Sequence, residues 1–325
     1  MLNKDVLKFD EGAEITKVSG VIREALSHVL RKRGLVIAMS SGIDSSVCAA
    51  LAVKALGPDK VFGLIMPERD SSSQSAKNAE LLARHLGIRY EIKDIAPTLE
   101  AIGCYHWRDE AICRALPEYG GGWKNKIVIS GGMEGRYNHF NLVAQSPSGE
   151  NREVRLELAN YLQIVAATNF KQRVRKTLEY FHADRLNYAV VGTPNRLEYD
   201  QGFFVKNGDG SADVKPIAHL YKTQVYALAS FMKLPEVICN TTPTTDTYSL
   251  PQGQDEFYFA LPFQKMDIAL WALNHGVPST EVATALGISS AQAENVYADI
   301  QAKRRTTTYL HARPVLIEDV AEIHV

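Results

Sequence analysis

Residues 35–57 read LVIAMSSGIDSSVCAALAVKALG, and this stretch decides the fold. LVIAM is a short apolar run that favours a β-strand. In the following segment, SSVCAALAVKAL, residues Val47, Ala50, Leu51 and Lys54 recur at helical spacing. The polar turn SSGIDSS separates the two apolar runs. The stretch therefore predicts a strand, a tight turn and a helix.

The same rhythm continues downstream of this unit. VFGLIM at 61–66 predicts a buried strand, SQSAKNAELLARHLG a helix capped by Ser72 or Ser73, and IRYEIKDI at 88–95 a third strand. Strands that alternate with helices indicate a parallel sheet with helices on its faces. The predicted fold class is α/β, with a doubly wound, Rossmann-like parallel sheet and a helical C-terminal part.

Between Gly103 and about Glu153 the rhythm fails, in a glycine-rich stretch that contains EYGGGWKNK and SGGMEGRYNHFN. This predicts an insertion at about 104–153 that includes a hairpin, and its length favours a binding role over a plain connection. A first domain is expected over residues 1–257, and a helical appendage over 258–325.

Beyond the insertion, helical and strand patterns resume. VRLELANYLQIVAATNFKQRVRKTLEYFHA predicts a long helix with Leu158, Leu162 and Val165 on its apolar stripe. NYAVVGTP predicts a further strand, and LYKTQVYALASFM predicts another helix. These elements extend the alternating pattern into the second half of the chain.

Composition limits the classes of function that the chain can serve. With 325 residues, 46% of them hydrophobic, the chain can bury a large core. Lys plus Arg (36) nearly balance Asp plus Glu (37), so the overall basic charge of a nucleic-acid-coating protein is excluded. No run approaches the roughly 20 apolar residues of a membrane-spanning helix, and the N-terminal residues do not resemble a signal peptide. A protein without membrane contact is expected.

Cysteine usage points to the compartment. Cys48, Cys104, Cys113 and Cys239 form no CxxC pair and lie in dissimilar surroundings, which suggests neither a disulfide framework nor a zinc site. A reducing environment fits this pattern best. The expected location is the cytoplasm.

The turn SSGIDSS carries the chemistry that is expected at the carboxyl end of a parallel strand. A helix N-terminus there offers free backbone N–H groups to an anion, and Gly42 allows close approach of the backbone. The serine hydroxyls can donate hydrogen bonds to phosphate oxygens. A carboxylate beside phosphates calls for a cation, so Asp44 is best explained as a Mg²⁺ ligand. The predicted phosphate-binding residues are Ser40, Ser41, Gly42, Asp44, Ser45 and Ser46.

The turn resembles SGGxDS, the pyrophosphate loop of the ATP pyrophosphatases, whose fold is the adenine nucleotide alpha hydrolase type. It differs from both the GxxxxGK[ST] and the GxGxxG phosphate loops. Ser41 stands where that family has its first glycine, and this fits only if the φ angle of Ser41 is negative and its side chain points away from the phosphate. The simpler alternative is a serine-capped helix start whose Asp44 stabilises the helix dipole.

Further motifs resemble one branch of this superfamily, the ammonia-dependent NAD synthetases. They are MPERDSSSQSAKNAELLARHLGI, NFKQRVR at 169–175, and VVGTPNRLEYDQGFFVKNGDGSAD, followed by LYKTQV and TPTTD. Together with the opening loop they cover most of residues 35–256. The resemblance implies a ligase of NAD biosynthesis that uses ATP and Mg²⁺ to adenylate the carboxylate of deamido-NAD. Ammonia would then displace AMP and leave an amide.

The resemblance also implies roles for individual residues. The ATP contacts beyond the loop would be Thr193, Lys222 and Thr244, and the metal ligands Asp44 and Glu198. Residues on the deamido-NAD side would be Arg173, Phe203, Lys206, Asp209 and Asp213. Arg173 is preferred over Arg175 because it lies four residues from Asn169 on the helix. Asp44, Lys222 and Asp209 would take part in catalysis.

Each of these residues also has a purely structural alternative. Asp209 in NGDG can be a turn residue, and Phe203 a core residue. Lys206 and Lys222 can be solvated surface charges. Their joint order and spacing favour the functional interpretation.

The acceptor side leaves alternatives open. The family's C-terminal His-Lys-Arg run is missing, and KRRTTTYLHARP offers Lys303, Arg304, Arg305, His311 and Arg313 in its place. The same adenylation chemistry could therefore act on another carboxylate, such as a sugar acid or a natural-product intermediate.

Partners are also implied. The segment STEVATALGISSAQAENVYADIQAKRR resembles a helix-turn-helix and could bind DNA, although near-zero net charge argues against that. The resemblance implies a homodimer. Nitrogen would come from free ammonia or from a separate glutamine amidotransferase.

Overall fold

A four-stranded parallel sheet forms the centre of the molecule. The computed structural model describes residues 2–130, 139–241, 248–259, 261–320 and 322. Strands β1 (Leu35–Ala38), β2 (Val61–Ile65), β3 (Arg89–Ile92) and β7 (Ala189–Val190) lie in the order β3-β2-β1-β7. Every pairing in this sheet is parallel. The predicted α/β sheet is confirmed.

Helices cross over between the first three strands as the alternating pattern predicts. They are α2 (Ile43–Leu56) and α3 (Ser73–Leu86), which follow β1 and β2 respectively. Ser72 is the N-cap of α3, and its hydroxyl accepts a hydrogen bond from the backbone N–H of Gln74. Of the two predicted caps, Ser72 is therefore the one used.

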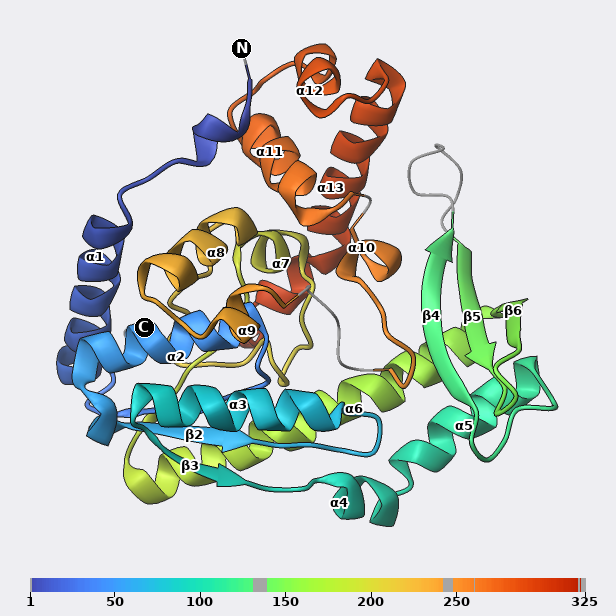
Figure 1. Cartoon of the computed structure of the whole chain (residues 1–325), viewed down its shortest axis with the longest axis horizontal. Helices are drawn as coiled ribbons and strands as arrows, with labels where there is room; N and C mark the ends of the chain where they lie inside the picture. Colours follow the sequence, from blue (N-terminus) through green and yellow to red (C-terminus); the bar gives the residue numbers. More distant parts are fainter. Residues whose placement is uncertain (1, 131–138, 242–247, 260, 321, 323–325) are drawn as a thin grey trace.

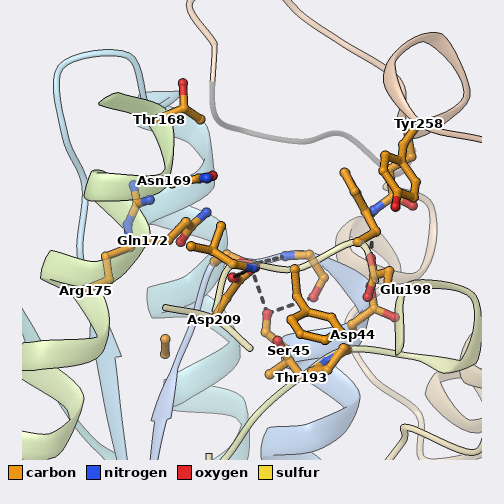
Figure 2. Close-up of a pocket in the computed structure, with 18 of the residues that line it drawn as sticks. Asp44, Ser45, Thr168, Asn169, Gln172, Arg175, Thr193, Glu198, Asp209 and Tyr258 are labelled. Atoms are coloured by element: carbon orange, nitrogen blue, oxygen red, sulfur yellow. Dashed lines mark hydrogen bonds between the residues drawn. The ribbon is translucent and has the colours of Figure 1, made fainter. Parts of the chain in front are cut away.

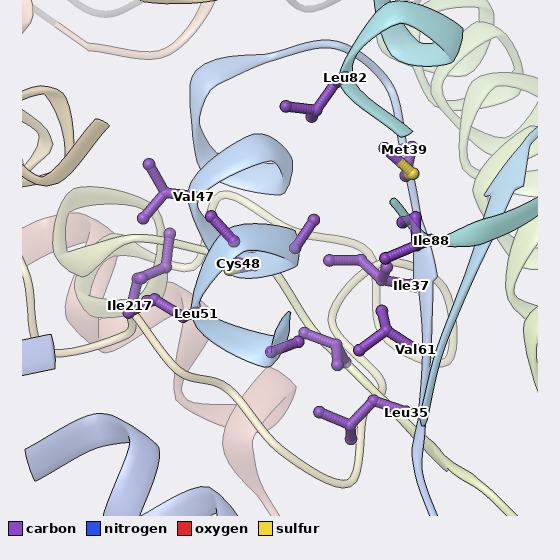
Figure 3. Close-up of a cluster of buried hydrophobic side chains, with 14 of the residues drawn as sticks. Leu35, Ile37, Met39, Val47, Cys48, Leu51, Val61, Leu82, Ile88 and Ile217 are labelled. Atoms are coloured by element: carbon purple, nitrogen blue, oxygen red, sulfur yellow. The ribbon is translucent and has the colours of Figure 1, made fainter. Parts of the chain in front are cut away.

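Both faces of the sheet are buried. Leu35 and Ile37 point from β1 into a cluster with Val47 and Leu51 of α2 (Figure 3). Val36, between them in sequence, belongs to a different cluster on the other face, which includes residues of α6 (Leu158–Leu186). Successive side chains of a strand point to opposite faces, so β1 has to be apolar on both sides. This explains why LVIAM is uniformly hydrophobic.

The insertion folds into one helix, α5 (Cys104–Ala115), and a separate sheet, and the short helix α4 (Ala96–Ala101) comes just before it. Both helices precede the antiparallel strands β4 (Lys124–Ser130), β5 (His139–Gln145) and β6 (Asn151–Arg155). The hairpin prediction is confirmed and extended by a third strand. This sheet stands beside one end of α6, away from the central sheet (Figure 1). The sequence pattern does not predict α5.

The predicted apolar stripe of the long helix is wrong at its start. Leu158 and Leu162 are 70% and 54% exposed, whereas Ile164 and Ala167 are buried. The first turns of α6 pack against β5 through Tyr161, whose ring stacks on Phe140 at 3.8 Å between centroids. This contact turns the face that carries Leu158 and Leu162 toward solvent.

The C-terminal helices surround an apolar cluster of their own. Helices α11 (Phe263–Asn274), α12 (Ser279–Leu286) and α13 (Ser290–His311) supply most of its residues. Leu197 of α7 (Arg196–Gln201) and Leu2 belong to the same cluster. The remaining helical segments are η1 (Lys4–Leu7), α1 (Glu11–Glu24), η2 (Ala25–Val29), η3 (Pro58–Lys60), α8 (Lys222–Phe231), α9 (Glu236–Cys239) and α10 (Gln254–Phe257). In the described part of the chain, none of the helices is both long and apolar enough to cross a bilayer.

Candidate active site

A cavity of about 790 Å³ lies at the carboxyl ends of β1, β2 and β7. Asp44, Ser45, Thr193 and Glu198 lie along one side of it, and residues of α6 lie along the other (Figure 2). Helix α13 supplies a further wall through Lys303, Thr306, Thr307 and other residues. Ligands of open α/β sheets bind at this edge, so the cavity is the candidate active site.

The opening loop presents hydroxyl groups to the cavity. Ser40, Ser41, Gly42 and Ser45 line the cavity, and the hydroxyls of Ser40 and Ser45 lie 3.1 Å apart. Ser46 is fully buried, and its hydroxyl donates to the carbonyl of Gly42 at 2.8 Å. Ser46 therefore holds the loop rather than facing the cavity.

Ser41 does not have the negative φ angle that the sequence led us to expect. Ser41 adopts φ 65°, in the left-handed region, and its side chain is buried. A residue with a Cβ atom is strained in this conformation by about 1 to 2 kcal/mol. The loop thus keeps the backbone geometry that a glycine would supply, at the cost of strain.

A pair of variants isolates the strain at Ser41. We expect Ser41→Gly to have a free energy of unfolding about 1 kcal/mol higher than Ser41→Ala, because glycine alone adopts this φ without strain. Urea denaturation of the two proteins measures the difference. A higher stability for Ser41→Ala would contradict the left-handed conformation.

Asp44 and Lys222 form an ion pair at the centre of the site. Asp44 lies in the first turn of α2, and its other carboxylate oxygen accepts from the side-chain amide of Asn195 at 3.1 Å. Lys222 is the first residue of α8 and is 2% exposed. It is therefore not a solvated surface charge. Its position places a fixed positive charge beside the phosphate loop.

Glu198 lies beside this pair as a second carboxylate. Its two oxygens accept hydrogen bonds from Gln254 Nε2 at 2.9 Å and from the backbone N–H of Asn195 at 3.1 Å. Burial, together with the nearby charge of Asp44, raises the pKa of Glu198 to about 7. Two neighbouring carboxylates, those of Asp44 and Glu198, are a donor set that fits a divalent cation. Mg²⁺ commonly takes one or two carboxylates and completes its shell with phosphates and water.

Asp267 of α11 fixes the start of α8. Its carboxylate accepts from the backbone N–H groups of Lys222 at 3.2 Å and Thr223 at 2.7 Å. Asp267 is fully buried, and this burial raises its pKa to about 6. The carboxylate thus holds in place the turn from which Lys222 reaches Asp44.

The raised pKa of Asp267 predicts a pH-dependent stability. The stabilisation that accompanies a raised pKa is complete below the ordinary value near 4 and is lost as the pH rises through about 6. Relative to Asp267→Asn, the wild type should therefore lose about 2 to 3 kcal/mol between pH 4 and pH 7. Thermal or urea unfolding of both proteins across this range measures it. A difference that does not change with pH would contradict the prediction.

Two residues predicted for the acceptor side line the cavity. Phe203 stacks on Tyr258 with 4.6 Å between ring centroids. Asp209 accepts from the backbone N–H of Val205 at 2.7 Å, and burial raises its pKa. Asp209 is thus a turn residue and a cavity residue at once.

Other predicted residues lie elsewhere. Lys206 donates to the carbonyls of Tyr309 and Ala312, at the end of α13, and Asp213 accepts from the backbone N–H of Val190 at 2.7 Å. Neither is among the described residues that line the cavity. Thr244 lies outside the described residues, while Thr193 does line the cavity.

The preference for Arg173 over Arg175 is corrected. Arg175 lines the cavity, whereas Arg173 is not among the described residues that line it and donates to the carbonyl of Lys206 at 3.3 Å. The cavity-facing stripe of α6 is centred on Gln172, on one side of Asn169. Arg173 lies on the opposite side of Asn169, so the four-residue spacing did not decide the question.

Several residues at or beside the cavity were not singled out by the sequence patterns, or were named only as one of a group. Asn195 forms a capping box with Glu198, and the N-x-x-E spacing could have revealed it. Lys303 is the member of the C-terminal basic group that lines the cavity, and burial lowers its pKa. Gln254 and Tyr258 come from a segment without a recognisable pattern. Thr307 packs closely on Gly202: a Cβ atom added at position 202 would lie 2.3 Å from the Cβ atom of Thr307.

The DNA-binding alternative is not favoured by the C-terminal helices. Helices α12 and α13 do form a hairpin at Gly287. Lys303, however, contacts Asp299 and the carbonyl of Tyr258, and Arg304 makes two contacts to the carboxylate of Asp200. These charges are directed into the protein and so do not form a basic surface for DNA.

Comparison with known proteins relates the chain to one family. The NAD synthase family model matches residues 14–114 and 147–307. The NH3-dependent NAD+ synthetase of Rhizobium meliloti (strain 1021) is 55% identical over 324 residues, which is 99% of this chain and 97% of that protein.

Two solved structures resemble the fold. An NMN synthetase from Francisella tularensis has a TM-score of 0.66 and 21% identity, covering 95% of this chain and 99% of its own. An NH3-dependent NAD synthetase from Campylobacter jejuni has a TM-score of 0.62 and 22% identity, covering 95% and 100%. At this level of identity the likeness concerns the fold.

Proposed function

This chain belongs to the NAD synthase family, and we propose that it is an NH3-dependent NAD+ synthetase. It would convert deamido-NAD, ATP and ammonia into NAD, AMP and pyrophosphate. The observation that carries this proposal is the meeting of the serine-rich loop, Asp44, Glu198 and Lys222 in one cavity. Together they supply hydroxyl donors, two carboxylates and a buried positive charge at one strand end.

In the first step, the substrate carboxylate attacks the α-phosphorus of ATP, the bond to the bridging oxygen breaks, and pyrophosphate leaves. Ser40, Ser45 and the start of α2 bind the departing phosphates. Lys222 is held rigidly by burial and by Asp44, so its charge stabilises the negative charge that develops in the transition state. Thr193 lines the same end of the cavity and would contact ATP.

Asp44 and Glu198 would hold Mg²⁺. The bound ion would supply charge neutralisation for the triphosphate and the pyrophosphate. Asn195 donates to both carboxylates, through its side-chain amide to Asp44 and its backbone N–H to Glu198. It therefore sets the orientation of the pair.

In the second step, ammonia attacks the carbonyl carbon of the acyl adenylate, and AMP leaves with the bond electrons. Ammonia that arrives neutral must lose one proton after the attack. Asp209 faces the cavity with a raised pKa, and we assign it the task of assisting this proton loss. The nitrogen would come from free ammonia or from a separate amidotransferase.

The acceptor would lie between α6 and the 203–209 segment. Phe203 and Tyr258 offer stacked rings for a heteroaromatic base, and Arg175 and Lys303 offer positive charge for a carboxylate or phosphate. Lys303 takes the place in the cavity that we expected for a C-terminal basic residue.

A product assay tests the proposal. Purified protein with ATP, Mg²⁺, ammonium and nicotinic acid adenine dinucleotide should form NAD, AMP and pyrophosphate in equal amounts. A parallel set of reactions replaces the dinucleotide by other carboxylates, including sugar acids. AMP formed with one of these and none with the dinucleotide would support the alternative acceptor.

We also propose that the enzyme is a homodimer. Leu158 and Leu162 are 70% and 54% exposed on successive turns of α6, which is unusual for large apolar residues on a long helix. A second subunit that covers this face would remove them from water. Sedimentation equilibrium measures the mass in solution, and a monomer at micromolar concentration would contradict the proposal.

A further inference from the structure

The β4–β6 sheet lies largely outside the segments that the NAD synthase family model matches. The matched segments end at residue 114 and resume at 147, so β4 and β5 fall between them. Both strands nevertheless reach the cavity, which they line with Ile129 and Phe140. The role of this sheet therefore has to be sought in this chain's own contacts.

Strand β4 binds the segment that precedes α10. The backbone N–H of Asn125 donates to the hydroxyl of Ser249 at 2.8 Å, and the backbone N–H of Leu250 donates to the carbonyl of Asn125 at 3.1 Å. Farther along, the side-chain amide of Gln252 donates to the carbonyl of Ile127. Gln252 is only 2% exposed, so this last bond is shielded from water.

The bound segment leads directly to the carboxylate pair. Helix α10 begins at Gln254, two residues after Gln252, and Gln254 Nε2 donates to Glu198 Oε1 at 2.9 Å. At the other end of α10, Phe257 packs edge to face against Tyr248, with ring centroids 5.9 Å apart. Both ends of α10 are thus fixed relative to β4 and its neighbours.

We propose that the β4–β6 sheet acts, through Gln254, as the positioning element for the metal carboxylate Glu198. This rests on the assignment of Asp44 and Glu198 as the metal ligands. Gln254 is a positioning residue: its amide holds one oxygen of Glu198, Asn195 holds the other, and β4 holds Gln254 in place.

The physical effect follows from how outer contacts act on metal ligands. A carboxylate that is free to rotate loses entropy when it binds an ion, whereas one already held by hydrogen bonds does not. Loss of such a contact typically weakens metal binding by about 10- to 100-fold. Because Gln254 is neutral, it orients Glu198 without adding charge to the site.

Metal binding by the whole protein tests the proposal. The probe is Mn²⁺, followed by electron paramagnetic resonance in the presence of α,β-methylene ATP, which reports the dissociation constant without turnover. Gln254→Met keeps the length of the side chain and removes the donor, and we expect it to weaken Mn²⁺ binding by about tenfold or more. Gln254→Asn keeps the donor on a shorter side chain, and its affinity for Mn²⁺ should lie between those of the wild type and Gln254→Met.

Gln252→Met tests the part assigned to the sheet. It removes the side-chain hydrogen bond from Gln252 to the carbonyl of Ile127 in β4 and leaves Glu198 and Gln254 unchanged. We expect it to weaken Mn²⁺ binding, as Gln254→Met does. The matched control is Gln145→Met, which removes a side-chain hydrogen bond to Asn151 within the same sheet. Its Mn²⁺ binding should equal that of the wild type.

The outcomes separate this inference from the proposed function. Wild-type binding by Gln254→Met, with Glu198→Gln clearly weakened, would overturn the inference alone and leave the metal assignment standing. Wild-type binding by Glu198→Gln would overturn both. Weak binding by Gln254→Met together with normal binding by Gln252→Met would overturn the role of the sheet. Thermal unfolding of each variant identifies any loss of fold.

Discussion

Asp44→Asn should reduce the rate of ATP-dependent pyrophosphate formation by about 100- to 1000-fold. The substitution keeps the size of the side chain but removes a charge that would hold Mg²⁺ against the triphosphate, and it leaves Lys222 without its ionic partner. The rate is measured by coupled pyrophosphate release with saturating ATP and Mg²⁺.

The control for this variant is Asp184→Asn, which removes an exposed carboxylate on α6 far from the loop. Its rate should match that of the wild type. If Asp44→Asn formed pyrophosphate at the wild-type rate, the metal role of Asp44 would be wrong, and the simpler helix-capping explanation would return.

Lys222→Met should lower kcat by about 100- to 1000-fold, with a smaller change in the KM for ATP. The charge of Lys222 is fixed before the substrate arrives, so it is most valuable when charge develops on the leaving pyrophosphate. Steady-state kinetics measures the two constants. Lys54→Met, at an exposed position of α2, is the matched control. A change confined to KM would contradict a transition-state role.

The Lys222 variant also leaves Asp44 unpaired, so its stability must be followed separately. Breaking one side of a buried pair costs about 3 to 5 kcal/mol, whereas removing both charges costs less. The double variant Asp44→Asn/Lys222→Met should therefore be more stable than Lys222→Met alone. Urea denaturation completes this double-mutant cycle and separates instability from lost catalysis.

The central sheet could be predicted because its signals are local. Within residues 35–92, each strand or helix can be recognised from a short run of consecutive residues. The phosphate loop can likewise be recognised from the single turn SSGIDSS. The stripe at Leu158 and Leu162 was wrong because an aromatic contact between Tyr161 and Phe140, distant in sequence, decides which face of α6 is covered.

The candidate site divides in the same way. Asp44, Glu198 and Lys222 lie in short motifs, so the sequence could indicate each of them. The structure shows that all three line the same cavity. Gln254 and Lys303 gain their positions from tertiary contacts alone, which a single sequence does not reveal. Lys206 and Asp213 show the reverse case, because a motif names them while the structure uses their side chains to hold backbone.

Because α13 forms one wall of the cavity, the cavity can be completed only late in the synthesis of the chain. The loop at Ser40 leaves the ribosome early, but Lys222 follows Asp44 by 178 positions, and Thr307, which packs on Gly202, comes later still. Contacts between such distant segments form slowly, because a long loop must first close. A nascent chain would thus carry an open, incomplete nucleotide cradle for most of its translation. ATP should begin to protect the protein from proteolysis only after α13 has emerged.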